Sequence, residues 1–276
     1  MTPELKEKMA RLDAWLEACP AAVVAYSGGT DSAFLAVAAG RRLGERAVAV
    51  LADSPSLPRR HLERARALAD RFGFRMEVVR TREMDRADYA ANGPDRCYHC
   101  KRELFETLNE RARAAGPDAV LLDGTNADDA SDYRPGRAAA REQGVHSPLL
   151  ELGFTKADIR AASREWDLPT ADAPASACLA SRLPYGTPVT AERLAQIERA
   201  EEALTALGFR QVRVRHHGEL ARIEIGADEM DRMLDPRLRA RALQQVTEAG
   251  YRYVALDLRG YRTGSLNPPD ASIPRE

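Results

Sequence analysis

Residues 23–34 are Val-Val-Ala-Tyr-Ser-Gly-Gly-Thr-Asp-Ser-Ala-Phe, and they place a sharp turn between two apolar segments. An apolar run ends at residue 26, and a helical apolar pattern starts after residue 32. A strand, a glycine turn and a helix N-terminus make an anion site, because the first amides of a helix lack partners within it. We therefore expect phosphate contacts from four residues: Ser27, Gly28, Gly29 and Ser32. The carboxylate of Asp31 is suited to hold Mg²⁺ against the phosphates.

No Gly-Lys-Ser/Thr follows at the spacing of the kinase-type phosphate loop. The hexapeptide Ser27–Ser32 resembles instead the PP-loop signature Ser-Gly-Gly-x-Asp-Ser of the ATP pyrophosphatases. That resemblance implies that ATP and Mg²⁺ are used, that ATP is split between its α and β phosphates, and that a substrate oxygen is adenylated. A nucleophile then displaces AMP. The alternative is a glycine-rich turn with no ligand.

Composition sets broad limits on the partners of this chain. Its 276 residues carry 41 Lys plus Arg against 42 Asp plus Glu, a net charge of −1, so nothing requires a nucleic-acid partner. No apolar stretch is long enough to span a membrane, and the charged N-terminal segment is unlike a signal peptide. We therefore predict a cytoplasmic location, in which the four cysteines serve as ligands or catalysts rather than in disulfides.

Strands and helices are predicted to alternate through the first part of the chain. After an amphipathic helix over 3–18, strands are expected at 21–26, 46–52, 75–79 and 119–122, and helices at 31–43, 58–72, 100–115 and 135–143. This alternation predicts an α/β fold with a doubly wound parallel sheet and helices on both faces. Ligands bind at the carboxyl ends of such strands, where Ser27, the pair Asp53-Ser54 and Asp123-Gly124 lie.

A second, smaller α+β domain is predicted to follow a long functional loop at 168–189. Thr190 is expected to cap a helix over 191–207, and strands at 211–215 and 220–225 are expected to pair across a loop at 216–219. That loop places His216 and His217 on the surface rather than in catalysis. A helical region at 228–249 with a break at Pro236 and a strand at 251–258 complete the domain. We predict domains at 1–187 and 188–276.

Cys97-Tyr-His-Cys100 is a C-x-x-C motif, which fits zinc, a redox pair or an iron–sulfur cluster. The sequence has no second C-x-x-C, so the usual paired four-cysteine zinc pattern is absent. Cys178 lies in the proline-rich loop, and with it three thiolates fit a [4Fe–4S] cluster that has one open iron. Cys19 is predicted to be a small buried hydrophobic residue.

Three further motifs make the resemblance more specific: Gly124-Thr-Asn-Ala-Asp-Asp129, Ser131-Asp-Tyr-Arg-Pro-Gly136 and Cys178-Leu-Ala-Ser-Arg-Leu-Pro-Tyr-Gly186. Together with the PP-loop, from about residue 20 to about residue 260, they make the chain similar to the LarE-type ATP-dependent sulfur transferases of nickel-pincer nucleotide biosynthesis. The resemblance implies that a carboxylate of pyridinium-3,5-biscarboxylic acid mononucleotide is adenylated and then attacked by sulfur, giving a thiocarboxylate.

The same resemblance implies one of two sulfur sources. In one branch the cysteine at the position of Cys178 is sacrificed and becomes dehydroalanine. In the other branch three cysteines hold a [4Fe–4S] cluster, and a sulfide on the open iron is transferred. Because Cys97, Cys100 and Cys178 are all present, we favour the cluster branch. Ala177 stands where a proline is frequent, which we interpret as a small loop change.

Carried over position by position, the resemblance also implies contacts for individual residues. Asp53 and Ser54 would contact the adenosine, and the nucleotide site would be lined by Gly124, Thr125, Asn126 and Asp129. Ser181 and Arg182 would hold the substrate phosphate or the adenylate. Arg213 and Arg215 share one face of a strand and would help to bind the substrate phosphate; the alternative is a solvated face of alternating charge. Glu224 is a candidate metal ligand, and Arg134 is a basic residue whose role is open. The resemblance also implies that the chain assembles into a homohexamer.

Three other functions remain open. A tRNA thiolation enzyme also combines a PP-loop with cysteines, although the near-neutral charge and the lack of an RNA-binding appendage argue against it. An amide-forming ligase of the NAD- or GMP-synthetase kind would use ammonia in place of sulfur and would not need the three cysteines. A nucleotide- or cluster-sensing module would bind ATP without turnover.

Overall fold

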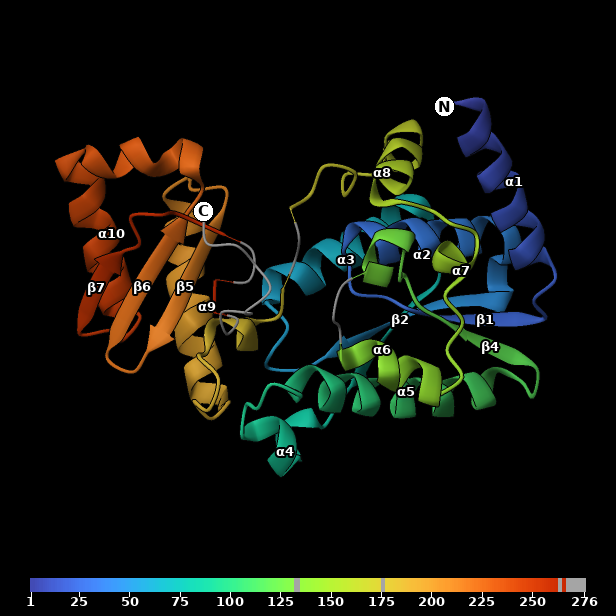
Figure 1. Ribbon diagram of the computed structural model, residues 1–276, viewed down its shortest axis with the longest axis horizontal. Helices are drawn as coiled ribbons and strands as arrows, with labels where there is room; N and C mark the ends of the chain where they lie inside the picture. The colour runs from blue at the N-terminus through green and yellow to red at the C-terminus, as the bar shows by residue number, and fades with distance from the viewer. Residues whose placement is uncertain (132–134, 175–176, 263–264, 267–276) are drawn as a thin grey trace. The chain divides into compact units, whose positions relative to one another are not determined.

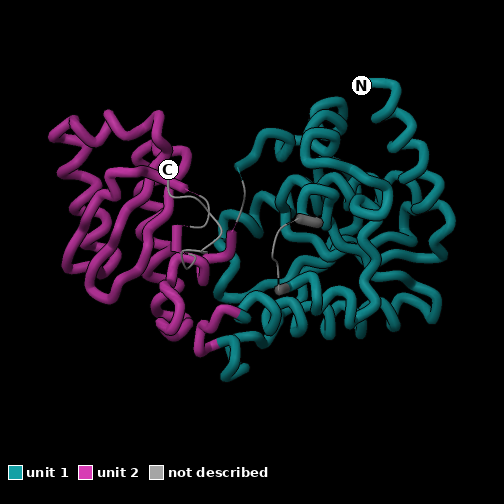
Figure 2. Tube along the Cα trace, in the orientation of Figure 1, with its two compact units in different colours: residues 1–89, 95–176 teal, residues 90–94, 177–276 magenta. Residues whose placement is uncertain are grey.

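The computed structural model describes residues 1–276 except 132–134, 175–176, 263–264 and 267–276, so Arg134 lies outside the described residues. The chain divides into two compact units (Figure 2). Unit 1 comprises residues 1–89 and 95–176, and unit 2 comprises residues 90–94 and 177–276. Among the described residues no helix is both long and apolar enough to cross a membrane.

Unit 1 is built on a four-stranded sheet in the order β3-β2-β1-β4. Its strands are β1 (Ala21–Ala25), β2 (Ala47–Asp53), β3 (Met76–Arg80) and β4 (Ala119–Leu122), and all three neighbouring pairs are parallel. The predicted parallel sheet is therefore confirmed. The strand order changes direction between β1 and β4, which is where ligands bind in sheets of this kind.

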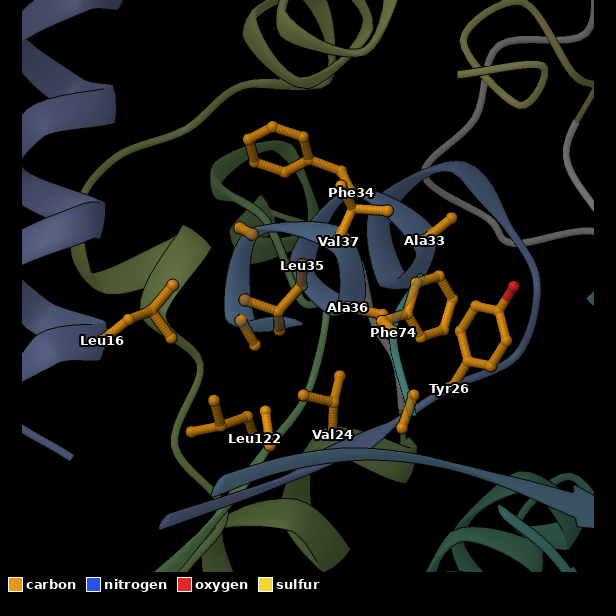
Figure 3. Close-up of a cluster of buried hydrophobic side chains, with 14 of the residues drawn as sticks. Leu16, Val24, Tyr26, Ala33, Phe34, Leu35, Ala36, Val37, Phe74 and Leu122 are labelled. Atoms are coloured by element: carbon orange, nitrogen blue, oxygen red, sulfur yellow. The ribbon is translucent and has the colours of Figure 1, made fainter. Parts of the chain in front are cut away.

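Helices cover both faces of this sheet, as the alternating pattern predicted (Figure 1). Val24 of β1 lies in a core with the helices α1 (Pro3–Glu17), α2 (Thr30–Leu43), α3 (Arg59–Phe72) and α8 (Lys156–Glu165). Its neighbour Val23 lies in a second core with α5 (Arg96–Ala115) and α6 (Pro135–Glu142). Successive strand residues point to opposite faces, so one short apolar strand supplies both cores. Figure 3 shows the first of these cores, with Val24 near Phe34, Leu35 and Val37 of α2.

Two features of unit 1 differ from the sequence-based expectation. Helix α5 begins at Arg96 with Asp95 as N-cap, not at Cys100, so both cysteines of the C-x-x-C motif lie in its first turns. Helix α8 was not anticipated; Thr155 and Asp158 form a capping box at its start. The remaining elements are short: η1 (Gly44–Arg46), η2 (Glu83–Asp85), α4 (Ala87–Ala90), η3 (Ala127–Ser131) and α7 (Pro148–Glu151).

Unit 2 is the predicted α+β fold. Its sheet has the order β5-β6-β7, with β5 (Val212–His217) antiparallel and β7 (Tyr253–Leu256) parallel to β6 (Leu220–Ile225). The Thr190 hydroxyl accepts from the Arg193 amide at 3.3 Å and caps α9, which confirms the expected cap. The helices are η4 (Leu179–Arg182), α9 (Ala191–Ala206), η5 (Ala227–Leu234) and α10 (Pro236–Glu248), and the last two are separated at the predicted break.

The loop predicted at 216–219 is shorter than expected. β5 continues through His217, and the turn is confined to Gly218 and Glu219, because Gly218 adopts a φ of 66° that only a glycine takes readily. His216 is therefore a buried strand residue whose Nδ1 lies 3.1 Å from the Tyr251 hydroxyl, and its expected surface position was wrong. His217 is exposed.

Candidate functional site

The turn between β1 and α2 is braced by two serine hydroxyls. The Ser27 amide donates to Ser32 Oγ at 3.1 Å, and the two hydroxyl oxygens are 3.0 Å apart. Gly28, with a φ of 73°, takes a conformation that favours glycine. A Cβ on Gly28 would lie 3.2 Å from the Cβ of Ala65 on α3, so the turn also needs the small residue for packing.

The first turn of α2 leaves its amides available. Gly29 is the N-cap and provides no side-chain cap, and the first backbone bond of the helix runs from the Ala33 amide to the Gly29 carbonyl at 2.9 Å. The amides before Ala33 therefore have no acceptor in the helix and carry the positive end of its dipole. This geometry is suited to an anion such as a phosphate.

The turn after β4 lies directly against this helix start. A Cβ on Gly124 would lie 2.9 Å from the amide nitrogen of Ser32, closer than real side chains approach. Glycine at this position therefore allows the carboxyl ends of β1 and β4 to share one site. The sequence placed Gly124 at the nucleotide site, and the structure places it beside the PP-loop turn; a contact with nucleotide stays a prediction.

Side chains of the β4 turn mainly hold the turn itself. The Thr125 hydroxyl donates to Asp123 at 2.7 Å. The Asn126 side chain, which is 2% exposed, accepts from the Asp128 and Asp129 amides at 2.9 and 3.3 Å. The Asp129 carboxylate in turn accepts from the Asn126 amide at 3.2 Å. These residues shape the edge of the site whether or not they also touch a ligand.

The Asp31 carboxylate is paired with Lys156, a residue that the sequence did not single out. Lys156 Nζ lies 2.7 Å from both carboxylate oxygens of Asp31. Lys156 is the first residue of α8, and its amide donates to the Asp128 carboxylate at 2.8 Å. The only sequence signal near it was the Thr155/Asp158 capping box, which marks a helix start and not a site.

Asp53 and Ser54 line a pocket at the carboxyl ends of β2 and β3. The pocket has a volume of about 300 Å³ and is lined by Asp53, Ser54, Pro55, Arg59, Arg80 and Thr81. Arg59 shapes it, donating to the Asp53 carboxylate at 2.6 Å and to the Ser54 carbonyl at 2.7 Å. A contact of Asp53 and Ser54 with a nucleoside stays a prediction, and Arg59 is a pocket residue that the sequence did not indicate.

The C-x-x-C cysteines lie at the N-terminus of α5. Cys97 is exposed and Cys100 is half-buried. A Cβ on Gly136 of α6 would lie 3.6 Å from the Cys97 carbonyl oxygen, so α6 packs closely beside this turn. Cys19, by contrast, is buried, and burial raises the pKa of its thiol, which confirms its predicted packing role.

In unit 2, Cys178 is exposed and is the N-cap of η4. Its loop is held by Arg182, which is buried and donates to the carbonyls of Ala177 and Cys178 at 2.8 and 2.9 Å. The other side of the guanidinium forms a two-point ion pair with Glu201 at 2.8 and 2.9 Å. Arg182 therefore positions the Cys178 loop, and a direct contact with substrate stays a prediction.

Arg215 connects the same loop to β6. It donates to Ser181 O at 3.0 Å and to a single oxygen of buried Glu224 at 2.9 and 2.7 Å. The other Glu224 oxygen accepts from Arg222 at 3.2 Å and from Ser265 at 2.7 Å. Both oxygens are thus engaged by protein donors, an arrangement that favours an ion-pair role for Glu224 over metal binding.

Arg213 is buried on the same strand, with its guanidinium carbon 5.2 Å from the centre of the Tyr261 ring. Burial, together with the nearby charge of Arg182, lowers the pKa of Arg213. A cation held in a dehydrated position attracts an anion strongly once one can reach it.

The predicted site residues thus fall into two groups. The PP-loop, Asp53, Ser54 and the β4 turn share the carboxyl edge of the sheet in unit 1, whereas Cys178, Ser181, Arg182, Arg213, Arg215 and Glu224 belong to unit 2. Within the described ranges, no group of three His, Cys, Asp or Glu residues is placed to hold a metal ion. Cys97 and Cys100 lie in unit 1 and Cys178 in unit 2, and the thiols of these cysteines have the donor chemistry of an iron–sulfur cluster.

Comparisons with known proteins agree with this geometry. The NAD synthase family model matches residues 6–117, which contain the PP-loop and the C-x-x-C motif. The uncharacterized protein slr1717 of Synechocystis sp. is 44% identical over 263 residues, covering 95% of this chain and 98% of its own length. The uncharacterized protein MJ0830 of Methanocaldococcus jannaschii is 28% identical over 243 residues, covering 87% of this chain and 90% of its own length.

A third relative has a named activity. The pyridinium-3,5-bisthiocarboxylic acid mononucleotide synthase of Lactiplantibacillus plantarum is 37% identical over 264 residues, which cover 95% of both chains. A match over 95% of this chain cannot be confined to one of the two units. This chain therefore belongs to the LarE family of pyridinium-3,5-bisthiocarboxylic acid mononucleotide synthases.

Proposed function

We propose that this enzyme uses ATP and Mg²⁺ to insert sulfur into pyridinium-3,5-biscarboxylic acid mononucleotide. The observation that carries the proposal is the match to the Lactiplantibacillus plantarum synthase, which covers 95% of both chains. The first turn of α2, whose amides are open for phosphate, supports it. A carboxylate becomes a good electrophile only when one of its oxygens is made a leaving group. An ATP site is therefore the chemical requirement that unit 1 meets.

The first half of the reaction is adenylation. A substrate carboxylate oxygen attacks the α-phosphorus, the bond to the bridging oxygen breaks, and pyrophosphate leaves with the electron pair. The open amides of α2 and the hydroxyls of Ser27 and Ser32 hold the phosphates, and Asp31 holds Mg²⁺. The pocket beside Asp53 and Ser54 takes the nucleoside.

The second half is sulfur transfer. A sulfur nucleophile attacks the acyl carbon, and AMP leaves with the original carboxylate oxygen. Unit 2 binds the substrate phosphate through its buried arginines Arg213 and Arg215, next to the loop that Arg182 holds. A second round on the other carboxylate gives the dithio product.

Cys97, Cys100 and Cys178 would hold the [4Fe–4S] cluster, whose open iron supplies a transferable sulfide when the cluster is bound. The exposure of Cys97 and Cys178 makes both thiols accessible for assembly. The alternative source is Cys178 itself. Its Sγ would form a thioester, and loss of the Cα proton with cleavage of the Cβ–S bond would leave dehydroalanine and a thiocarboxylate.

The direct test uses protein purified without oxygen and incubated with ATP, Mg²⁺ and the pyridinium substrate. We expect AMP and pyrophosphate in equal amounts and a product with the mass of a sulfur-for-oxygen exchange. Asp31→Asn should lose this activity, whereas Asp13→Asn, which removes a surface partner of Arg42, should retain it. Release of ADP, or an amide product when ammonia replaces sulfur, would contradict the proposal.

The sulfur source is tested on the same samples. The cluster route predicts iron and acid-labile sulfide that are lost in Cys97→Ala, with an unchanged mass for Cys178 after turnover. Loss of H₂S from Cys178 in an iron-free protein would instead establish the sacrificial route. Light scattering tests the expected homohexamer, and cell fractionation tests the expected cytoplasmic location.

A further inference from the structure

Residues 90–94 are a short excursion of the chain from unit 1 into unit 2. They group with unit 2, whereas the residues on both sides, 1–89 and 95–176, belong to unit 1 (Figure 2). Asn92 is the middle residue of this excursion and is fully buried, at 0% exposure. Its φ of 58° lies in the left-handed region, which asparagine adopts more readily than most residues. The excursion therefore centres on a buried polar side chain, and such a group needs hydrogen-bond partners.

The partners of Asn92 include carbonyls of the segment that follows Cys178. The Asn92 side-chain amide donates to the Pro184 and Thr187 carbonyls at 2.8 Å each, and the Asn92 carbonyl accepts from the Gly186 amide at 3.0 Å. All of these atoms belong to unit 2. Because the amide nitrogen carries two hydrogens, one side chain serves both carbonyls. These three hydrogen bonds are called the Asn92 clamp below.

The base of the excursion is held by the histidine of the C-x-x-C motif. His99 Nδ1 lies 2.9 Å from the carboxylate of Asp88, which precedes the excursion, and His99 Nε2 lies 3.0 Å from the carboxylate of Asp95, which follows it. Asp95 is also the N-cap of α5, whose first turns carry Cys97 and Cys100. The base of the excursion is therefore fixed to the turn that carries both cysteines.

We propose that Asn92 is a positioning residue that joins the Cys178 loop to the C-x-x-C turn. This inference rests on the part that the proposed function gives these cysteines in sulfur transfer. Cys97 follows Asn92 by five positions and Pro184 follows Cys178 by six, whereas 81 positions separate the two cysteines along the chain. A short connection keeps two groups at a high effective concentration, because the entropy lost on bringing its ends together grows with its length.

Positioning matters here because the cysteines come from two segments of the chain. Thiolate ligands of one iron–sulfur cluster must meet at a single centre, so a chain that already restricts their separation loses less entropy when they do. Arg182 fixes the start of the Cys178 loop by donating to the Cys178 carbonyl at 2.9 Å, and the Asn92 clamp fixes its end. Asn92 acts through the loop and takes no part in the chemistry.

The test measures cross-linking of the cysteines in the iron-free, reduced full-length chain with a short bis-maleimide. Peptide mass spectrometry gives the ratio of within-chain products that join Cys178 to the C-x-x-C motif to the product that joins Cys97 to Cys100. Asn92→Gly keeps a residue suited to positive φ but removes both side-chain donors. The ratio should fall about tenfold, the factor for losing about one net hydrogen bond.

The matched control is Asp167→Gly. In the described part of the chain, Asp167 is the other non-glycine residue with a positive φ, at 54°, and it is exposed in unit 1. The control makes the same kind of backbone change away from the clamp, so its ratio should stay at the wild-type value. Asn92→Asp keeps the volume of the side chain but cannot donate to two carbonyls, so its ratio should fall as in Asn92→Gly.

Three results would overturn the inference. An unchanged ratio in Asn92→Gly would show that the clamp does not set the separation of the two segments. An equal fall in Asp167→Gly would indicate a general effect of added glycine, and a wild-type ratio in Asn92→Asp would show that the donors are not needed. Thermal unfolding of each variant identifies the temperature at which all of them are folded for the comparison.

A second readout is the iron and acid-labile sulfide content after purification without oxygen, which should be lower in Asn92→Gly than in Asp167→Gly. The affinity for Mg²⁺–ATP should be unchanged in both. The cross-linking needs neither iron, ATP nor the pyridinium substrate. If the ratio falls as expected but wild-type protein inserts no sulfur, the clamp stands and the proposed function falls. If the ratio is unchanged while wild-type protein inserts sulfur, the clamp alone is refuted.

Discussion

Replacing Gly124 by alanine should damage the fold and the nucleotide site together. The added Cβ would lie 2.9 Å from the Ser32 amide nitrogen and 3.1 Å from the Asp31 carbonyl carbon, so both contacts are with backbone that cannot rotate away. An ordinary contact of 3.4 Å requires a shift of about 0.5 Å at the first turn of α2. Overpacking of this kind costs about 1–3 kcal/mol, and the lower entropy of unfolded alanine offsets less than about 1 kcal/mol.

The net loss of about 1–2 kcal/mol should lower the midpoint of thermal unfolding by about 2–8 °C. The same shift misaligns amides at the anion site, so ATP affinity should fall about tenfold. The matched control is Gly29→Ala, whose φ is −79° and whose nearest contact would be Ser27 Oγ at 3.4 Å. Its stability should stay within about 0.5 kcal/mol of wild type. A Gly124→Ala protein with wild-type stability and ATP affinity would refute the close approach of β4 to α2.

Further variants test unit 2 and the cysteines. Glu201→Gln should cost about 3–5 kcal/mol in urea unfolding, because it leaves buried Arg182 uncompensated. Burial opposes ionisation of Glu201, but the charge and hydrogen bonds of Arg182 hold the pKa of Glu201 below the unfolded value of about 4.3. The stabilisation from the Glu201–Arg182 pair is therefore present above that pH and is lost as the pH falls further. Burial lowers the pKa of His216, so the free energy of unfolding should fall as the pH drops below about 6.5. His216→Gln should weaken this dependence of stability on pH. An unchanged pH dependence in that variant would contradict the assignment to His216. Cys19→Ala should retain sulfur transfer, measured as thiocarboxylate product, whereas Cys178→Ala should lose it. Equal activities of the two variants would contradict both the packing role of Cys19 and the role of Cys178 in sulfur transfer.

Much of unit 1 could be predicted because its signals are local. An amphipathic helix was predicted over 3–18, and Leu5, Met9, Leu12 and Leu16, which recur at helical spacing, are the buried residues of α1. The run before Ser27 identified β1, and the glycine turn identified the start of α2. Local periodicity and turn chemistry are short-range properties, so one sequence is enough to locate them.

The start of α5 was placed too late for an equally local reason. Asn92, Gly93 and Pro94 indicate a turn, and the Asp95 side chain forms no cap hydrogen bond that would mark the helix start. Pairing between distant residues was out of reach altogether. Asp31 and Lys156 are 125 positions apart, and no periodicity connects them.

The arginines of unit 2 show the same limit. Their spacing along β5 correctly placed Arg213 and Arg215 on one face, but it did not indicate which carboxylates would pair with them. In the folded unit Arg215 is paired with Glu224, because a buried cation needs a nearby anion. Which carboxylate supplies that charge depends on the register of β5 with β6, and the sequence alone does not specify that register.

The most informative experiment follows a labelled oxygen from the pyridinium substrate. The carboxylates are enriched with oxygen-18, and the AMP released with Mg²⁺ and ATP is analysed by mass spectrometry. If the carboxylate attacks the α-phosphorus and sulfur then displaces AMP, each AMP carries one labelled oxygen and pyrophosphate carries none. Unlabelled AMP accompanied by thiocarboxylate product would show that sulfur insertion proceeds without carboxylate adenylation.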